Sequence, residues 1–407
     1  MDNNYQIYTL PNGMRLACRR HQGMVSYIGV TINAGSRDEL LSRQGLAHFV
    51  EHTLFKGTDK RRSWQISNRM ETVGGELNAY TSKEETMIYT SAPAGYEERA
   101  VELIADLITS SRFPDEEIER EKEVVIEEIY SYLDSPSESV YDEFEDLAYA
   151  GSGLAHNILG TPESVRSLHG EFCREFIDRH YTPGNMVAYC LSPLDPDKFY
   201  NLACKYFGTL HYPDIKPDRS TPPLPERFDM VKDKDHHQAN TIIGARVFGR
   251  KDPARYSLFL LNNYLGGPNM NSRLNRELRE KRGYVYAVDS SVSLLSDTGL
   301  WVTYFGCEKS KLKRCRQLIM NEIDRLCQKK LSANSIEKMK RQYCGQLLLS
   351  SDHSENRAMA MAKSLLYYGE INDISVTTQK IMEVTADELM ETARLISPAN
   401  CNILSLT

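Results

Sequence analysis

The feature that most limits the fold of this 407-residue chain is an order of elements that occurs twice. In the first half, the alternating segment Val25–Ile32 leads through a polar loop into a helical pattern that begins after Gly45. In the second half, Asn240–Phe248 alternates in the same way and leads through Gly249–Asp252 into a helical pattern at Ala254–Leu265. Alternation predicts half-buried strands, and the apolar spacing that follows predicts amphipathic helices. The repetition therefore predicts two copies of one structural unit.

Each copy continues with a hairpin and then with helices. The predicted hairpins pair Glu76–Thr81 with Thr86–Ser91 in the first half, and Val285–Ser293 with Leu300–Phe305 in the second. The predicted helices that follow are Tyr96–Thr109 and Asp115–Leu133, and then Leu312–Cys327. A stretch with five prolines separates the copies and is typical of a semi-rigid linker. We predict an α+β fold of two homologous units in tandem, each an antiparallel-rich sheet with helices packed on one face: residues 1–212, a linker at 213–227, and residues 228–407.

Composition excludes several classes of function. The net charge is −7, the isoelectric point is near 5.9 and no basic block occurs, so the sequence gives no support for nucleic-acid binding. No secretory signal and no apolar run of about 18 residues is present, which predicts a cytoplasmic protein that does not cross a membrane. The nine cysteines include no Cys-x-x-Cys pair, which predicts free thiols rather than a disulfide framework.

The helical pattern after Gly45 contains His48-Phe49-Val50-Glu51-His52. On a helix the two histidines lie one turn apart on the same face, where neutral imidazoles can occupy two corners of a tetrahedral zinc site. Glu51 lies near the same edge, where a carboxylate can accept a proton from a water activated by the metal. His-x-x-Glu-His is the inverted zinc-peptidase signature. The alternative, a pair of packed core histidines, does not explain the glutamate between them.

Two histidines leave one protein ligand to be found. The helix Asp115–Leu133 offers four glutamates, namely Glu121, Glu123, Glu127 and Glu128. Glu121 and Glu128 are seven residues apart and share one edge of the apolar stripe, whereas Glu123 and Glu127 are expected to face solvent. Any one of these glutamates, taken alone, could equally be an ordinary surface residue. Spacing alone does not choose among them.

The chain resembles the pitrilysin-type (inverzincin, M16-like) zinc peptidases and, within them, the short-chain group similar to the mitochondrial processing peptidase. The resemblance extends over essentially the whole chain and includes, besides the histidine motif, the segments 74–81, 121–129, 158–162 and 279–286. It implies that Glu128 is the third zinc ligand and that Glu121 also acts in the site. It further implies one Zn²⁺ per chain.

The same resemblance implies a substrate-binding strand at Asn78, Ala79, Tyr80 and Thr81. Relatives of this type bind a peptide as an added strand on the corresponding edge, a mode that accepts varied extended sequences through main-chain pairing. The alternative is a plain core strand in which Tyr80 only packs. The pair Gly74-Gly75 just before this segment favours the edge role, because glycine permits close backbone approach.

Arg279 and Tyr286 match a pair that this family supplies from its second unit to hold the substrate and stabilise the oxyanion. The alternatives are a surface arginine and a half-buried strand tyrosine. In large single-chain relatives the pair comes from the opposite half of a clamshell, so a chain of this length implies a homodimer, or a heterodimer with a related subunit, in which each chain completes the other's site.

The sequence therefore predicts a zinc-dependent endopeptidase that hydrolyses short or unfolded peptides. The alternative from another class is a non-catalytic peptide-binding or partner subunit of a heterodimeric peptidase. Such subunits usually lack an intact ligand set, whereas His48, Glu51, His52 and Glu128 are all present here.

Overall fold

The computed structural model describes residues 5–210 and 217–407. The chain forms two compact units, and each unit is assembled from three segments. Unit 1 comprises Met1–Tyr130, His156–Arg219 and Ser350–Asp373, and unit 2 comprises Ser131–Ala155, Ser220–Leu349 and Ile374–Thr407. The prediction of two α+β units in tandem is confirmed.

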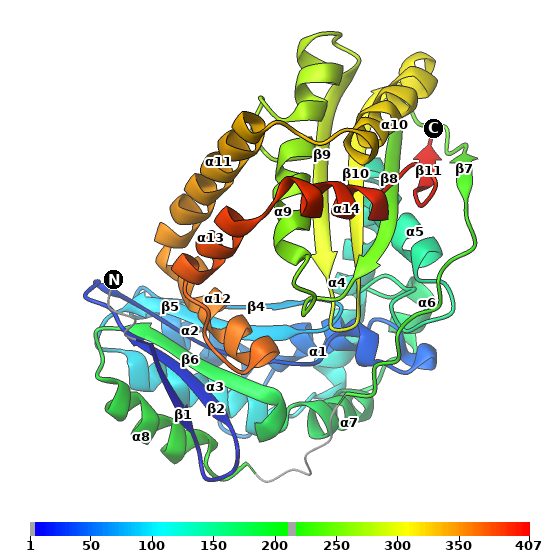
Figure 1. The fold of residues 1–407 in the computed structure, drawn as a ribbon. Helices are drawn as coiled ribbons and strands as arrows, with labels where there is room; N and C mark the ends of the chain where they lie inside the picture. Colours follow the sequence, from blue (N-terminus) through cyan, green and yellow to red (C-terminus); the bar gives the residue numbers. More distant parts are fainter. Residues whose placement is uncertain (1–4, 211–216) are drawn as a thin grey trace. The chain divides into compact units, whose positions relative to one another are not determined.

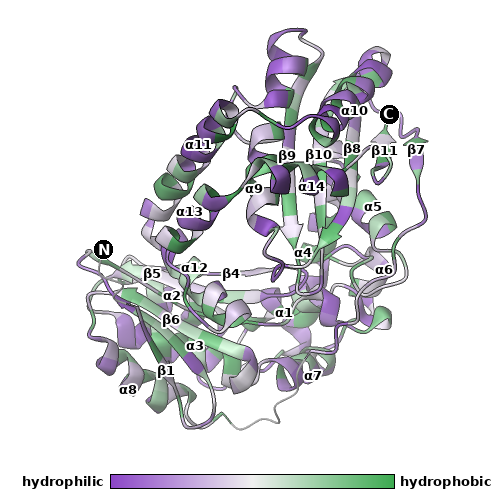
Figure 2. Ribbon diagram, in the orientation of Figure 1, coloured by the Kyte–Doolittle hydropathy of each residue, from purple (hydrophilic) through white to green (hydrophobic). Residues whose placement is uncertain are grey.

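Unit 1 is built on a six-stranded sheet in the order β1-β2-β6-β3-β5-β4. Only β2 and β6 run parallel, and all other neighbouring strands are antiparallel. The central strand β6 is buried along its whole length and is coloured as hydrophobic in Figure 2. The strands are β1 (Tyr5–Thr9), β2 (Arg15–Arg20), β3 (Val25–Ile32), β4 (Glu76–Thr81), β5 (Thr86–Pro93) and β6 (Met186–Ser192).

Helices from the first half of the chain enclose the larger core of unit 1, and several of them pack directly on the strands of one face of this sheet (Figure 1). Their apolar stripes supply that core, as in α3, where the buried residues include Ala100, Leu103, Ile104 and Leu107. These helices are α1 (Leu46–Leu54), α2 (Ser63–Glu71), α3 (Glu97–Ser110), α4 (Asp115–Leu133), α6 (Pro162–Arg166), α7 (Gly170–His180) and α8 (Pro196–Phe207).

The opposite face of the unit 1 sheet is covered by α12 (Ser354–Tyr368), which comes from the second half of the chain. Ala358, Met361 and Leu365 of this helix form a core with Val187 and Leu191 of β6. The expectation of helices on one face therefore describes the contribution of the first half only. Helix α12, which is distant in sequence from the strands that it covers, forms the helical layer on the second face.

Unit 2 has a five-stranded sheet in the order β7-β11-β8-β10-β9, with β7 and β11 parallel and the others antiparallel. One face carries helices of the second half, and the other carries α5 (Pro136–Ala148) from the first half, packed through Val140 and Phe144. The other elements are β7 (Asp229–Lys232), β8 (Gln238–Phe248), β9 (Val285–Leu294), β10 (Thr298–Glu308), β11 (Asn402–Leu406), α9 (Arg255–Gly266), α10 (Leu312–Gln328), α11 (Ala333–Asp352), α13 (Ile374–Glu383) and α14 (Ala386–Leu395).

The predicted limits 1–212 and 228–407 differ from the two compact units, because Ser131–Ala155 of the first range belongs to unit 2 and Ser350–Asp373 of the second range belongs to unit 1. Of the predicted linker, residues 213–216 lie outside the described part of the chain, whereas Arg219 binds Asp38 and Asn33 within unit 1. All nine cysteines have free thiols, as predicted. Among the described residues, no helix combines the length and apolarity needed to span a bilayer.

Candidate metal centre and peptide-binding edge

Helix α1 presents His48 and His52 on the same side, with ring centroids 4.5 Å apart in an edge-to-face arrangement. The helix keeps this orientation because its other side is part of the core of unit 1. The buried core residues of α1 are Leu46, Ala47, Phe49, Val50 and Leu54. The motif that carries the imidazoles is therefore held by the apolar residues between and around them.

Helix α4 brings Glu128 to the two histidines. Its Oε2 lies 3.7 Å from His48 Nε2 and 3.5 Å from His52 Nε2, and the three ligand atoms lie within 4.8 Å of one another. A tetrahedral zinc ion with bonds of about 2.0–2.2 Å needs ligand atoms roughly 3.3–3.6 Å apart, so the two separations that involve Glu128 are close to those of a zinc site. Glu123 and Glu127 on the same helix are exposed to solvent.

The protonation of His48 suits a metal ligand. Burial, with the neighbouring His52, lowers the pKa of His48 to about 3, so its ring is neutral near pH 7. Metal binding requires the neutral imidazole. Its Nδ1 is buried without a hydrogen-bond partner among the described residues, while its Nε2 faces Glu128.

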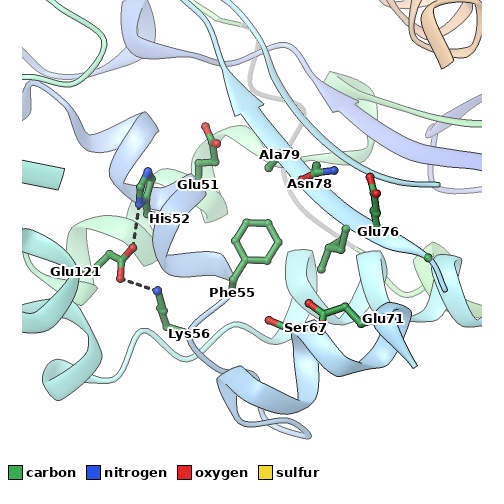
Figure 3. A pocket seen from close by; sticks show the side chains of 12 residues that line it. Glu51, His52, Phe55, Lys56, Ser67, Glu71, Glu76, Asn78, Ala79 and Glu121 are labelled. Atoms are coloured by element: carbon green, nitrogen blue, oxygen red, sulfur yellow. Dashed lines mark hydrogen bonds and ion pairs between the residues drawn. The ribbon is translucent and has the colours of Figure 1, made fainter. Parts of the chain in front are cut away.

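Glu121 lies outside the group of three candidate ligands but contacts one of them. Its Oε1 lies 2.9 Å from His52 Nδ1 (Figure 3), which leaves His52 Nε2 to face Glu128. Its Oε2 forms a 2.6 Å ion pair with Lys56, a residue that the sequence reasoning missed although it lies four positions after His52. Burial alone would raise the pKa of Glu121, but His52 and Lys56 lower it below the ordinary value. A carboxylate in this position fixes the orientation of a ligating histidine.

Glu51 lies on α1 beside strand β4 (Figure 3). Burial raises the pKa of this carboxyl group, with Thr81 and His52 opposing the shift, and Oε2 has no hydrogen-bond partner among the described residues. A raised pKa brings a carboxylate closer to the range in which it exchanges protons efficiently. Glu51 is therefore free to accept a hydrogen bond and a proton from a molecule in the site.

Strand β4, which contains Asn78–Thr81, is the outermost strand of the unit 1 sheet. It pairs with β5 on one side, and no strand among the described residues pairs with its other side. Asn78 is exposed, whereas the Tyr80 hydroxyl donates to Glu85 at 2.8 Å, and Glu85 in turn pairs with Lys363 of α12. The main chain of β4 thus provides an open edge, while the Tyr80 side chain is tied to the sheet's second layer.

A cavity of about 490 Å³ lies between this strand, α2 and the histidine motif (Figure 3). It combines carboxylates with apolar surface. Its lining residues are Glu51, His52, Phe55, Lys56, Ser67, Glu71, Gly75, Glu76, Leu77, Asn78, Ala79 and Glu121. The cavity places the candidate base next to a space that can hold a side chain of an extended peptide.

Arg279 and Tyr286 belong to unit 2. Arg279 is exposed on a π-helical turn, Asn275–Glu280, just before the outer strand β9. On that strand, Tyr286 is 48% exposed and its hydroxyl donates to Asn240 at 3.0 Å. The Tyr286 ring lies so close to Gly306 that a Cβ there would come within 2.1 Å of it. The role of this pair in the site stays a prediction.

Two sequence models of protein families match the chain. Residues 15–162 match the family described as insulinase (peptidase family M16), and residues 170–343 match the peptidase M16 inactive domain. The second match agrees with the absence of the histidine motif from the second copy, where Leu261-Asn262-Asn263-Tyr264-Leu265 occupies the equivalent helix.

Curated relatives and solved structures agree with these matches. An uncharacterized zinc protease of Streptomyces coelicolor is 31% identical over 95% of this chain and 86% of its own length. The uncharacterized zinc protease YmxG of Bacillus subtilis is 30% identical over 95% of this chain and 94% of its own length. The crystal structure of a protease from Helicobacter pylori has the same fold, with a TM-score of 0.91, 21% sequence identity and 99% coverage of both chains. The resemblance to the pitrilysin-type peptidases is thus confirmed, and the chain belongs to the M16 peptidase family.

Proposed function

We propose that this protein is a zinc-dependent endopeptidase that cleaves short or unfolded peptides bound as an added strand on β4. The observation that carries the proposal is the group of His48, His52 and Glu128, with ligand atoms within 4.8 Å of one another, next to an edge strand whose outer side pairs with no strand in the described part of the chain. Peptide main chain can pair with such an edge without regard to most side chains. Folded proteins rarely offer an extended segment for this pairing.

Each residue of the candidate site has a separate role in the proposed hydrolysis. A zinc ion held by His48, His52 and Glu128 would polarise the scissile carbonyl and lower the pKa of a water molecule. Glu51 accepts the proton of that water on its carboxylate and passes it to the departing amine. Glu121 keeps His52 oriented. Strand β4 aligns the peptide.

A digest of a peptide library with and without a chelator tests the proposal. We expect cleavage at internal bonds, loss of cleavage after treatment with 1,10-phenanthroline, and recovery when zinc is restored, because the ligand set cannot polarise a carbonyl without its metal. A folded protein of similar length serves as the control substrate and should resist cleavage. Zinc binding without cleavage of any peptide would instead favour the non-catalytic partner subunit.

We further propose that two copies of the chain associate and that Arg279 and Tyr286 of one copy complete the site of the other. The test mixes two inactive variants, Glu51→Gln and Arg279→Ala, and follows subunit exchange with two different tags. After random mixing, half of the dimers contain one copy of each variant. In each of these mixed dimers one of the two sites is intact, so we expect about one quarter of wild-type activity. A mixture of Glu51→Gln with Glu128→Gln is the control and should recover nothing. Exchange without recovery in the first mixture would contradict the shared site.

A further inference from the structure

The carboxylate of Glu39 is buried at the start of the helix that carries the histidine motif. Its side chain has no exposed surface, although it lies in a loop. Glu39 Oε1 accepts a hydrogen bond from the backbone N–H of Ala47 at 2.6 Å, and Oε2 accepts one from the N–H of Gly45 at 2.9 Å. The same Oε2 lies 3.0 Å from Nε2 of His156. Both oxygens are thus occupied by donors from α1 and from a distant segment.

Helix α1 needs this carboxylate because it has no cap of its own. The first N–H groups of a helix lack partners within the helix, and a Ser, Thr, Asp or Asn at the N-cap position usually satisfies them. In α1 the N-cap is Gly45, which has φ = +88° and no side chain. A Cβ at this position would lie 2.5 Å from the carbonyl oxygen of Leu159, so no larger residue fits. Glu39 reaches the helix start from six residues upstream instead.

His156 links this cap to the hairpin that ends in the candidate substrate strand. Its side chain is 4% exposed, and its ring nitrogen Nε2 faces Glu39. Its own carbonyl accepts a hydrogen bond from Lys83, which lies in the turn between β4 and β5. One buried group therefore connects the start of the metal-binding helix with the turn that follows the peptide-binding edge.

Capping a helix with a buried carboxylate has a cost in free energy, because burial disfavours the charged form. Burial raises the pKa of Glu39, opposed by His156 and by the N–H groups of Ala47 and Gly45, which stabilise the charged form. Removing one partner from such a buried group is strongly destabilising, whereas loss of an ordinary N-cap side chain has a smaller effect on stability. The hydrogen bonds of Glu39 fix the position of the first turn of α1 along the helix axis and its rotation about that axis. His48 is the third residue of this helix.

We propose that Glu39, supported by His156, is a positioning residue that sets the zinc affinity of the histidine motif by fixing the N-terminal turn of α1. This inference rests on the proposed function, because it assigns Glu39 a role toward the same metal site. A purely structural cap would affect the stability of unit 1 but not the affinity of the folded protein for zinc. That difference makes the proposal testable.

The experiment compares Glu39→Gln with Glu97→Gln in the full-length protein. Glu97 is a matched control: it is also buried, begins helix α3, and accepts hydrogen bonds from Ser26 Oγ and from the N–H of Gly95. Zinc affinity is measured by competition with a chromogenic chelator, the stability of the folded protein by Tm, and the order of residues 45–49 by hydrogen–deuterium exchange without metal. Steady-state kinetics provides kcat and KM separately.

We expect Glu39→Gln to weaken zinc binding by about 10–100-fold, the range that follows when a group that orients a metal ligand is lost. It should also lower kcat more than KM, and accelerate exchange at residues 45–49. Glu97→Gln should lower Tm while zinc affinity stays at the wild-type value. His156→Gln, which keeps a donor toward Glu39, should weaken zinc binding less than His156→Ala.

A Glu39→Gln protein that melts earlier but binds zinc as tightly as the wild type would overturn the proposal. If Glu39→Gln does not fold, the same measurements on Glu39→Asp, His156→Gln and His156→Ala test the proposal. A wild-type protein that binds no zinc would refute the proposed function, and the exchange experiment would then still report separately whether Glu39 orders the start of α1.

Discussion

Replacement of Glu51 by glutamine is expected to reduce peptide cleavage by about 10²–10⁴-fold while the protein retains its zinc. Glutamine has nearly the same size and keeps the contacts of α1 with strand β4, but its amide cannot accept a proton. Burial raises the pKa of Glu51 while Thr81 and His52 oppose that shift, and its buried Oε2 has no hydrogen-bond partner among the described residues, so this oxygen is available to accept a proton. The zinc content, measured by elemental analysis, should equal that of the wild type.

Glu123→Gln is the matched control for this variant, because Glu123 is an exposed glutamate on α4 and does not belong to the group of candidate ligands. It should cleave at the wild-type rate. If Glu51→Gln retained substantial turnover with bound zinc, another group would have to serve as the base. If it lost zinc, Glu51 would have to be regarded as part of the metal site rather than as a separate base.

The two-unit fold could be predicted from local patterns, whereas the exchange of helices could not. Alternation and apolar spacing identify strands such as β3 and helices such as α3 because each pattern reflects burial of one face within a short segment. The same spacing in α12 shows that the helix is amphipathic but not which sheet it covers. Its partners on β6 lie more than 150 residues away in the sequence. Only tertiary packing decides that choice.

The candidate site likewise contains residues that local spacing identifies and residues that it cannot identify. His48, Glu51 and His52 occur within one helical turn, so their spacing alone places them together. Glu128 lies on a different helix, and the sequence identified it through the family resemblance and not through any spacing. Lys56 and Glu39 were missed because neither forms a pattern. Lys56 contacts the candidate ligands through its ion pair with Glu121, and Glu39 binds the start of α1, which Gly45 leaves without a side-chain cap.

Glu128→Gln is expected to lose zinc, whereas Glu127→Gln is expected to keep it. Glu128 Oε2 lies 3.5–3.7 Å from the Nε2 atoms of both histidines, and glutamine offers only a neutral carbonyl oxygen in its place. Loss of a group that only orients a metal ligand weakens zinc binding by roughly 10–100-fold. Because Glu128 is itself a candidate ligand, its loss should weaken zinc binding by more than this. Competition with a chromogenic chelator measures the affinity, and cleavage should fall in parallel.

Glu127 is a stringent control because it is the same residue type, on the same helix and one position away. It is exposed, and its direction differs from that of Glu128 by about 100°, the rotation per residue of an α-helix with 3.6 residues per turn. Equal zinc affinities for the two variants would remove α4 from the ligand set. The reverse order, with Glu127→Gln losing zinc, would shift the ligand by one residue and require α4 to rotate relative to α1. Since Ile118, Val125 and Ile129 bury the apolar side of α4 in the core of unit 1, that rotation would expose the stripe that holds the helix in place.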